Sequence, residues 1–171
     1  MTKDPLTLYK LIVLYMLNRV SFPLTKAQVC DFILDREYTT FMTLSQAVSE
    51  LTDADMIRAK SIRNRTHLEI TPEGRQTLDF FSNRISSKIK DEIDTYFKEN
   101  SFQLKNEVSV VSNYYKSTSG EYEANLIIKE KNVNLLDIKL SVPSESLASE
   151  ICDKWENSNQ DIYKYLVEKL F

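Results

Sequence analysis

Four basic side chains stand close together in a short stretch of the chain that contains no acidic residue. The stretch runs from Met56 to Leu68, and its cations are Arg58, Lys60, Arg63 and Arg65. Residues 56–60 and 66–70 flank a polar segment and predict a β-hairpin with cations at its tip. Such cations can bind phosphate oxygens, and arginine also favours a narrow minor groove. A merely solvated face is the alternative, but the lack of acids favours a phosphate-bearing partner.

The segment before this hairpin is expected to carry a polar surface as well. Residues 39–52 predict a helix with one narrow apolar stripe, formed by Phe41, Leu44, Val48 and Leu51. Burial of this stripe would turn four polar side chains outward: Thr39, Thr40, Thr43 and Gln46. Hydroxyls and an amide can contact phosphates or base edges, and glutamine can bond to adenine with two hydrogen bonds. The helix has no lysine or arginine, which leaves a protein-binding surface open as the alternative.

Several kinds of chemistry are excluded by single residue counts. The chain has two glycines, Gly74 and Gly120, so it can form neither a P-loop nor a dinucleotide-binding fingerprint. Its one histidine, His67, excludes a multi-histidine metal site, and we expect it to have a structural role. Cys30 and Cys152 are isolated and predict packing residues in a reducing compartment. We therefore expect no enzyme activity, no cofactor and no metal.

The elements that must position these residues can be read from periodicity. The first half predicts helices near 5–19, 26–36 and 39–52, then the hairpin, then a helix that starts at Thr71-Pro72. Thr25 and Thr71 are suited to cap their helices. The last of these helices either continues to about Asn100 or breaks near Ser86-Ser87. We assign residues 1–84 to one domain and 85–104 to a connecting helix.

The second half has alternating apolar residues in place of helical spacing. Residues 108–115, 122–128 and 136–142 predict three strands in an antiparallel meander, because the connections between them are short and rich in turn residues. Two helices should follow, one capped by Ser144 and one starting near Asn159. Residues 105–171 then form an α+β domain for dimerisation or for binding an effector. The expected fold class of the chain is α+β.

Charge and hydropathy place the chain among cytosolic proteins. It has 171 residues and a net charge of −3, with +1 in residues 1–84 and −4 in residues 85–171. The longest apolar run, residues 11–17, is too short to span a bilayer, and the N-terminus lacks the pattern of a signal peptide. We expect a cytoplasmic location and no membrane partner.

The order of helices and hairpin resembles the winged helix-turn-helix of bacterial transcriptional regulators. The link between the third helix and the hairpin, residues 51–57, resembles the one in these regulators, and residues 68–75 are similar to the Leu-Thr-x-x-Gly junction of the MarR and PadR families. The resemblance covers the first half of the chain. As a whole, the chain also resembles a Gram-positive bacterial winged-helix family with an α+β C-terminal domain.

The resemblance implies a homodimer that binds double-stranded DNA in a sequence-specific manner. The third helix and the hairpin would then make the contacts, through the eight residues named above. A winged helix that binds proteins without binding DNA is the alternative. Six aromatic residues are expected to lie mainly in the core, and a pocket that binds a planar small-molecule effector is the alternative: Tyr96, Phe97, Phe102, Tyr114, Tyr115 and Tyr122.

Overall fold

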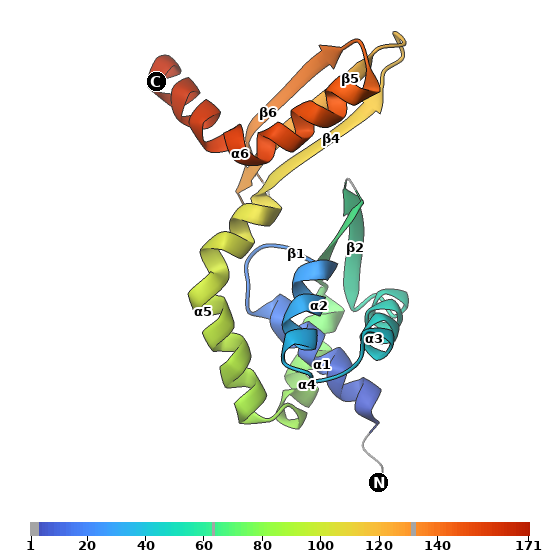
Figure 1. Ribbon diagram of the computed structural model, residues 1–171. Helices are drawn as coiled ribbons and strands as arrows, with labels where there is room; N and C mark the ends of the chain where they lie inside the picture. The colour runs from blue at the N-terminus through green and yellow to red at the C-terminus, as the bar shows by residue number, and fades with distance from the viewer. Residues whose placement is uncertain (1–3, 63, 131–132) are drawn as a thin grey trace. The chain divides into compact units, whose positions relative to one another are not determined.

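The computed structural model describes residues 4–62, 64–130 and 133–171 (Figure 1). It divides into two compact units, Met1–Val108 and Ser109–Phe171. The division falls at the end of the long helix α5 (Ser87–Ser109), so all of this helix except its last residue belongs to the first unit. The fold class is α+β, as expected, and both sheets are three-stranded and antiparallel.

The first unit begins with three capped helices, α1 (Pro5–Asn18), α2 (Lys26–Asp35) and α3 (Phe41–Asp53). Each N-cap side chain accepts a hydrogen bond from a backbone N–H of the first turn. At α2 the bond is reciprocal, because Thr25 accepts from the backbone of Gln28 and Gln28 accepts from the backbone of Thr25. The predicted positions of these helices are confirmed to within two residues.

A small sheet joins the segment before α2 to the hairpin. Its strands are β1 (Leu24–Thr25), β2 (Ile57–Ile62) and β3 (Arg65–Ile70), in the order β1-β3-β2. The hairpin was expected, whereas β1 was not, since two residues show no alternation. Asn64 in the hairpin turn has a φ of 63°, a left-handed conformation that asparagine tolerates well.

One apolar core holds the first unit together. It joins fully buried side chains from α1, α2, α3 and β3, among them Ile12, Ile33, Leu44 and Leu68. Helix α4 (Pro72–Phe81) is followed by a short 3₁₀ turn, η1 (Ser82–Arg84), and then by α5 (Ser87–Ser109). Ile85 at the break and Ile93 in α5 are buried in the same core, so the chain breaks near Ser86-Ser87 and folds back. Helix α5 runs past the expected end near residue 100.

The second unit is a meander covered by one helix. Its strands β4 (Val110–Lys116), β5 (Tyr122–Glu130) and β6 (Val133–Val142) pair in sequence order, which confirms the predicted topology. Val108, expected to begin the first strand, lies in α5 instead. Helix α6 (Glu145–Leu170) packs against one face of the sheet through Cys152 and Trp155.

The expectation of two C-terminal helices is wrong, since α6 is continuous over 26 residues. Asn159, the expected start of the second helix, lies inside it. Its Nδ2 donates to the carbonyls of Trp155 and Glu156, each at 2.9 Å. An asparagine that bonds to the preceding turn competes with the helix ladder and bends the helix, and Figure 1 shows α6 bending along its length. In the part of the chain described above, no helix is long and apolar enough to cross a bilayer.

Candidate nucleic-acid interface

The threonines before and within α3 have local roles at the start of the helix. Thr40 is the N-cap, and its Oγ1 accepts from the backbone N–H of Thr43 at 3.3 Å. The two hydroxyls also lie 3.1 Å apart and share a hydrogen bond. Thr40 is exposed, while Thr39 and Thr43 are half-buried. The sequence placed all three on the outer face, but it did not predict that two would be engaged in capping.

Gln46 is exposed on α3, as expected, and belongs to a small polar chain. Its Nε2 donates to Oε1 of Glu50 at 3.0 Å, and Glu50 also forms an ion pair with Lys10 of α1. The hydrogen bond from Lys10 and then that from Gln46 lower the pKa of Glu50. Lys10 therefore offsets an acidic charge that would otherwise oppose binding of a phosphate backbone near α3.

The buried face of α3 differs from the expected stripe. Leu44, Val48 and Leu51 are buried, but Ala47 takes the fourth position. Phe41, expected in the core, is 57% exposed, because it is the first residue of the helix and lies beyond the turns that pack on the core. Met42 beside it is 79% exposed. The N-terminal turn of α3 therefore presents two apolar side chains together with its threonines.

The hairpin gathers its cations on one face. Opposite residues of an antiparallel pair share a face, and the register pairs Arg58 with Glu69, Lys60 with His67, and Ile62 with Arg65. The opposite face carries Ile57, Leu68 and Ile70, which are buried. Exposed Arg58, Lys60 and Arg65 thus lie on the face away from the core. Arg63, also expected at this surface, lies outside the described residues.

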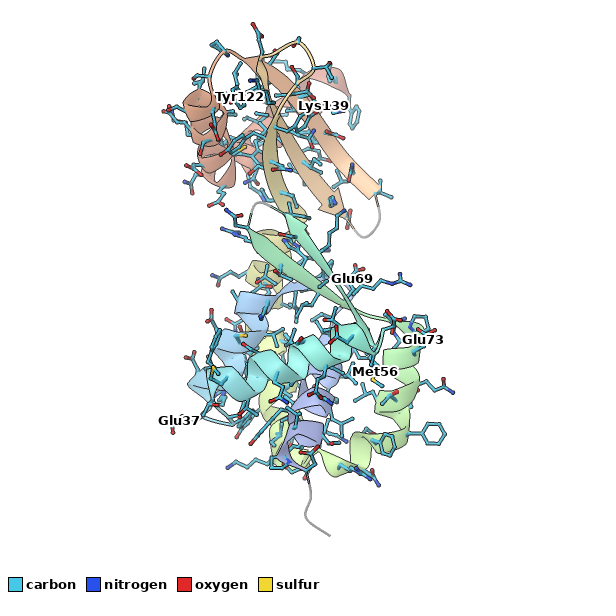
Figure 2. All side chains as sticks on the ribbon, turned by 90° about the vertical axis from the view of Figure 1, so that its right-hand side faces the viewer. Glu37, Met56, Glu69, Glu73, Tyr122 and Lys139 are labelled. Carbon is cyan, nitrogen blue, oxygen red and sulfur yellow. The ribbon has the colours of Figure 1, made fainter. Side chains whose placement is uncertain are left out.

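One acidic residue on this face was missed. Glu69, labelled in Figure 2, lies just beyond the acid-free stretch in sequence, but the strand register places it directly opposite Arg58. The period of two in a strand would have revealed it, because Glu69 and His67 must share a face. Arg58 therefore has a carboxylate beside it, and the positive end of the face lies toward Lys60 and Arg65. His67 is buried beside them, as expected of a structural residue.

The junction between hairpin and α4 fixes the hairpin to the end of α3. The hydroxyl of Thr71 donates to the carbonyl of Asp55 at 2.7 Å and accepts from the backbone N–H of Gly74 at 3.0 Å. The backbone N–H of Thr71 donates to the carbonyl of Met56 at 3.0 Å. Figure 2 shows Met56 and Glu73 at this junction. The end of α3, the hairpin and the start of α4 are therefore held in one arrangement.

The aromatic residues that were expected to cluster are divided between the two units. Tyr96 and Phe97 belong to the first unit, where the ring of Tyr96 lies 4.7 Å from that of Phe32. Tyr114 and Tyr115 belong to the second unit, where Tyr114 packs against the core beneath α6. Tyr122 is also in the second unit, and the side chain of Phe102 lies outside the description.

Two further features bear on chemistry. A surface groove of about 560 Å³ lies between residues 19–22 and α5, and its lining includes Arg19, Lys98 and Lys105. Across the described ranges, no cluster of three or more histidine, cysteine, aspartate or glutamate side chains could hold a metal ion. Cys30 and Cys152 are buried thiols outside any disulfide and lie in different units, and burial raises the pKa of Cys30.

Comparison with known proteins places the chain in a family. A family model with the description "Domain of unknown function (DUF4364)" matches residues 9–170, so the chain belongs to this family. No curated protein and no solved structure matches the chain. The match spans both structural units.

Proposed function

We propose that this member of the DUF4364 family is a homodimeric transcriptional regulator that binds double-stranded DNA in a sequence-specific manner. The observation that carries the proposal is the order of the helices and strands in the first unit. Its elements follow the order α1-β1-α2-α3-β2-β3, and α3 passes directly into a hairpin with cations on its outer face. This order supports a winged helix-turn-helix with α3 as the recognition helix and β2-β3 as the wing.

The proposed roles of the α3 side chains follow from their bonds. Thr39 and Thr43 would contact the phosphate backbone or base edges at the first turn of the helix. Thr40 would support that turn through its cap. Gln46 would read one base, with its amide leaving Glu50 for the base edge. Because this exchanges one hydrogen bond for another, its cost is small relative to a bidentate base contact.

The proposed wing contacts are electrostatic. Lys60 and Arg65 would bind phosphates, since they lie on the exposed face away from the core. Arg58 would contribute less, because Glu69 lies opposite it and attracts the same guanidinium. Arg63 is retained in the proposal on its sequence position alone. We place the protein in the cytoplasm, where it would have access to bacterial DNA.

The decisive experiment is selection of sheared genomic DNA by the purified protein at near-physiological salt, followed by sequencing. The proposal predicts enrichment of a shared inverted repeat, because a symmetric dimer binds two related half-sites. The variant that combines Lys60→Ala with Arg65→Ala should lose the enrichment. Lys116→Ala in the second unit is the matched control and should keep it. Absence of enrichment with a folded protein would refute the proposal.

One observation favours a second candidate, a winged helix that binds another protein without binding DNA. Phe41 and Met42 are both exposed at the start of α3, and adjacent exposed apolar residues are typical of protein contacts. This candidate predicts that Phe41→Ser with Met42→Ser abolishes capture of a partner, while Lys60→Ala with Arg65→Ala does not. The opposite pattern would favour the DNA-binding role.

A further inference from the structure

Strand β6 forms one edge of the sheet in the second unit, and nearly all of it is accessible to solvent. The strand order β4-β5-β6 leaves one side of β6 without a neighbouring strand in the part of the chain that the structure describes (Figure 1). Of the ten residues of β6, only Val142 is buried. Every second residue of an edge strand directs its backbone N–H and C=O away from the sheet, where they can pair with another strand.

The opposite edge of the same sheet is covered to a greater extent. Val111 and Ser112 of β4 are buried, and the hydroxyl of Ser112 donates to the carbonyl of Cys152 in α6 at 3.4 Å. On the β6 side, Leu140 belongs to the face toward α6 and is nevertheless 42% exposed. Helix α6 therefore packs toward β4 and β5, and β6 is the more open edge.

The middle of β6 has the same sequence in both directions, except that the charge is reversed. Ile138 is the centre, Leu136 and Leu140 lie two residues away on either side, and Asp137 and Lys139 lie one residue away. Because side chains alternate along a strand, the three apolar residues share one face and the two charged residues share the other.

The pairing with β5 confirms these faces. Leu136 and Ile138 pack against the core beneath α6. On the other face, the Nδ2 atom of Asn125 in β5 donates to Oδ1 of Asp137 at 2.7 Å, and the register places Asn125 opposite Lys139. Asp137 and Lys139, which is labelled in Figure 2, are both exposed on this face.

We infer that β6 pairs in antiparallel orientation with β6 of a second copy of this chain, with the two-fold axis at Ile138. Asp137 of each copy then lies opposite Lys139 of the other, and Leu136 lies opposite Leu140. Two pairs of opposite charge form on one face and three apolar pairs on the face toward α6, which are the side-chain pairs that stabilise a sheet. The inference deepens the proposed function by naming the surface that joins the two copies, and its role in DNA binding rests on that function.

The charges select a second copy and one register. Charges that only protect an edge need one sign, because like charges repel a second copy. In β6 the signs are opposite and the two residues are equally distant from Ile138, so both charges attract their partners. A shift of two residues would place Lys139 opposite Lys139, or Asp137 opposite Asp137. A shift of one residue would place a charge opposite an apolar side chain.

The length of regular strand limits the expected affinity. The register with β5 passes from Leu136 to Asn134, which leaves Leu135 in a bulge, and a bulge bends the strand. Pro143 follows the other end and has no N–H to donate. An interface this short buries less than the roughly 800 Å² per partner of a standard interface, so we expect a reversible dimer with a dissociation constant of about 1–50 μM without DNA.

The first test is sedimentation equilibrium of the full chain without DNA. Lys139→Asp places carboxylates opposite each other at both positions and should weaken the dimer at least about tenfold. Addition of Asp137→Lys restores opposite charges and should return the dissociation constant to within about threefold of wild type. Lys116→Asp, the same exchange at an exposed position of β4, is the matched control and should leave it unchanged. Circular dichroism should show the same secondary structure in all variants.

Salt gives a readout that a loss of folding would not reproduce. Screening weakens the attraction in the wild-type dimer and the repulsion in the Lys139→Asp dimer. The ratio of their dissociation constants should therefore fall at least about threefold between about 50 mM and about 500 mM sodium chloride. A ratio that does not change with salt would overturn the proposed charge pairing.

A disulfide test fixes the register. Cys30 and Cys152 are buried, so a cysteine introduced on β6 is the accessible thiol. A mixture of the Asp137→Cys and Lys139→Cys variants should form a disulfide between the two variants, because opposite Cα atoms of antiparallel strands lie about 4.5–5.5 Å apart. Lys139→Cys alone should form none, since its two copies would be about 8 Å apart. The reverse pattern would overturn the register.

The outcomes separate this inference from the proposed function. A wild-type chain that is monomeric at about 100 μM, a dimer that Lys139→Asp does not weaken, or a double variant that does not regain the dimer would each overturn the inference. Binding of a DNA half-site by the Lys139→Asp variant would leave the DNA-binding proposal intact in either case. A dimer with the predicted variant pattern that binds no DNA would support the interface and refute the proposed function.

Discussion

Gly74 lies directly against the backbone carbonyl of Met56: a Cβ atom at Gly74 would be 2.1 Å from this oxygen. The same carbonyl accepts the hydrogen bond from the backbone N–H of Thr71. Helix α4 can begin beside the hairpin only because residue 74 has no side chain. This glycine is required for a close backbone approach, and its presence in the Thr-Pro-Glu-Gly junction has a direct physical cause.

The first prediction concerns Gly74→Ala. The methyl group would displace the Met56 carbonyl or the side chain of Ile70, which is the next nearest atom at 2.9 Å. We expect a loss of about 2–3 kcal/mol in the free energy of unfolding, which outweighs the gain in helix propensity. Urea denaturation monitored by circular dichroism measures this free energy of unfolding. Gln76→Ala, at an exposed position of the same helix, is the control, and equal stability of the two variants would contradict the packing argument.

Much of this unit could be predicted from local signals. The caps Thr25 and Thr71 were readable because an N-cap acts within three residues of its own position. Strand β1 was not readable, since two residues become a strand only through pairing with β3. Phe41 was misplaced for a similar reason. Apolar periodicity shows which side of a helix is buried, but not how far along the helix the packing against the core extends.

The candidate site was predictable in its residue types and less so in its electrostatics. The cations of the hairpin were evident from composition, but the effect of Glu69 on Arg58 depends on strand register. The ion pair of Lys10 with Glu50 joins α1 to α3, so no local pattern could show it. In α6, Asn159 resembled a helix start, because the preference of asparagine for helix ends is a local signal, whereas its burial inside a continuous helix depends on tertiary packing.

The second prediction concerns pH and the contact between α1 and α5. The hydroxyl of Tyr15 donates to Asp94 at 2.9 Å, and Arg19 also bonds to this carboxylate at 2.9 Å. Burial, followed by the bond to Asp94, raises the pKa of Tyr15 to about 12. Tyrosine in the unfolded chain ionises near pH 10. The contribution of the Tyr15 hydroxyl to the free energy of unfolding is therefore complete below pH 10, and it is lost as the pH rises from about 10 to about 12.

Tyr15→Phe tests this contact. We expect it to cost about 1 kcal/mol at pH 8, the value of a partly exposed hydrogen bond to a charged group. The difference from wild type should shrink as the pH approaches 12. Urea denaturation at a series of pH values measures both quantities, with the exposed Tyr165→Phe as control. A constant difference between pH 8 and pH 12 would rule out the assigned linkage.

The third prediction concerns salt and the wing. If Arg65 binds a phosphate, Arg65→Ala weakens binding to every DNA sequence and reduces the slope of log K against log salt by about 0.9. Lys60→Ala should have the same effect, and the double variant should reduce the slope of log K against log salt by about 1.8. Fluorescence anisotropy over a range of salt concentrations measures the slope, with Lys116→Ala as control. An unchanged slope in the double variant would remove the wing from the DNA interface.

The fourth prediction concerns base reading by Gln46. Gln46→Ala should relax the preference at one base position and cost about 1–3 kcal/mol there, while affinity at altered sites stays nearly unchanged. Ser49→Ala, an exposed substitution on α3, is the control. Competition binding with single-base variants of the selected site measures the preference. A uniform loss at all sites would assign Gln46 a phosphate contact in place of a base contact.

The fifth prediction uses the two thiols as reporters of the two units. Cys30 and Cys152 are buried in separate units, so each reacts with a thiol reagent only when its own surroundings open. We expect both to react at least about 100-fold more slowly in the native protein than in urea. Because Gly74 lies in the first unit, Gly74→Ala should accelerate modification of Cys30 more than that of Cys152. Mass spectrometry of labelled peptides separates the two rates, and equal acceleration would show that the units unfold as one.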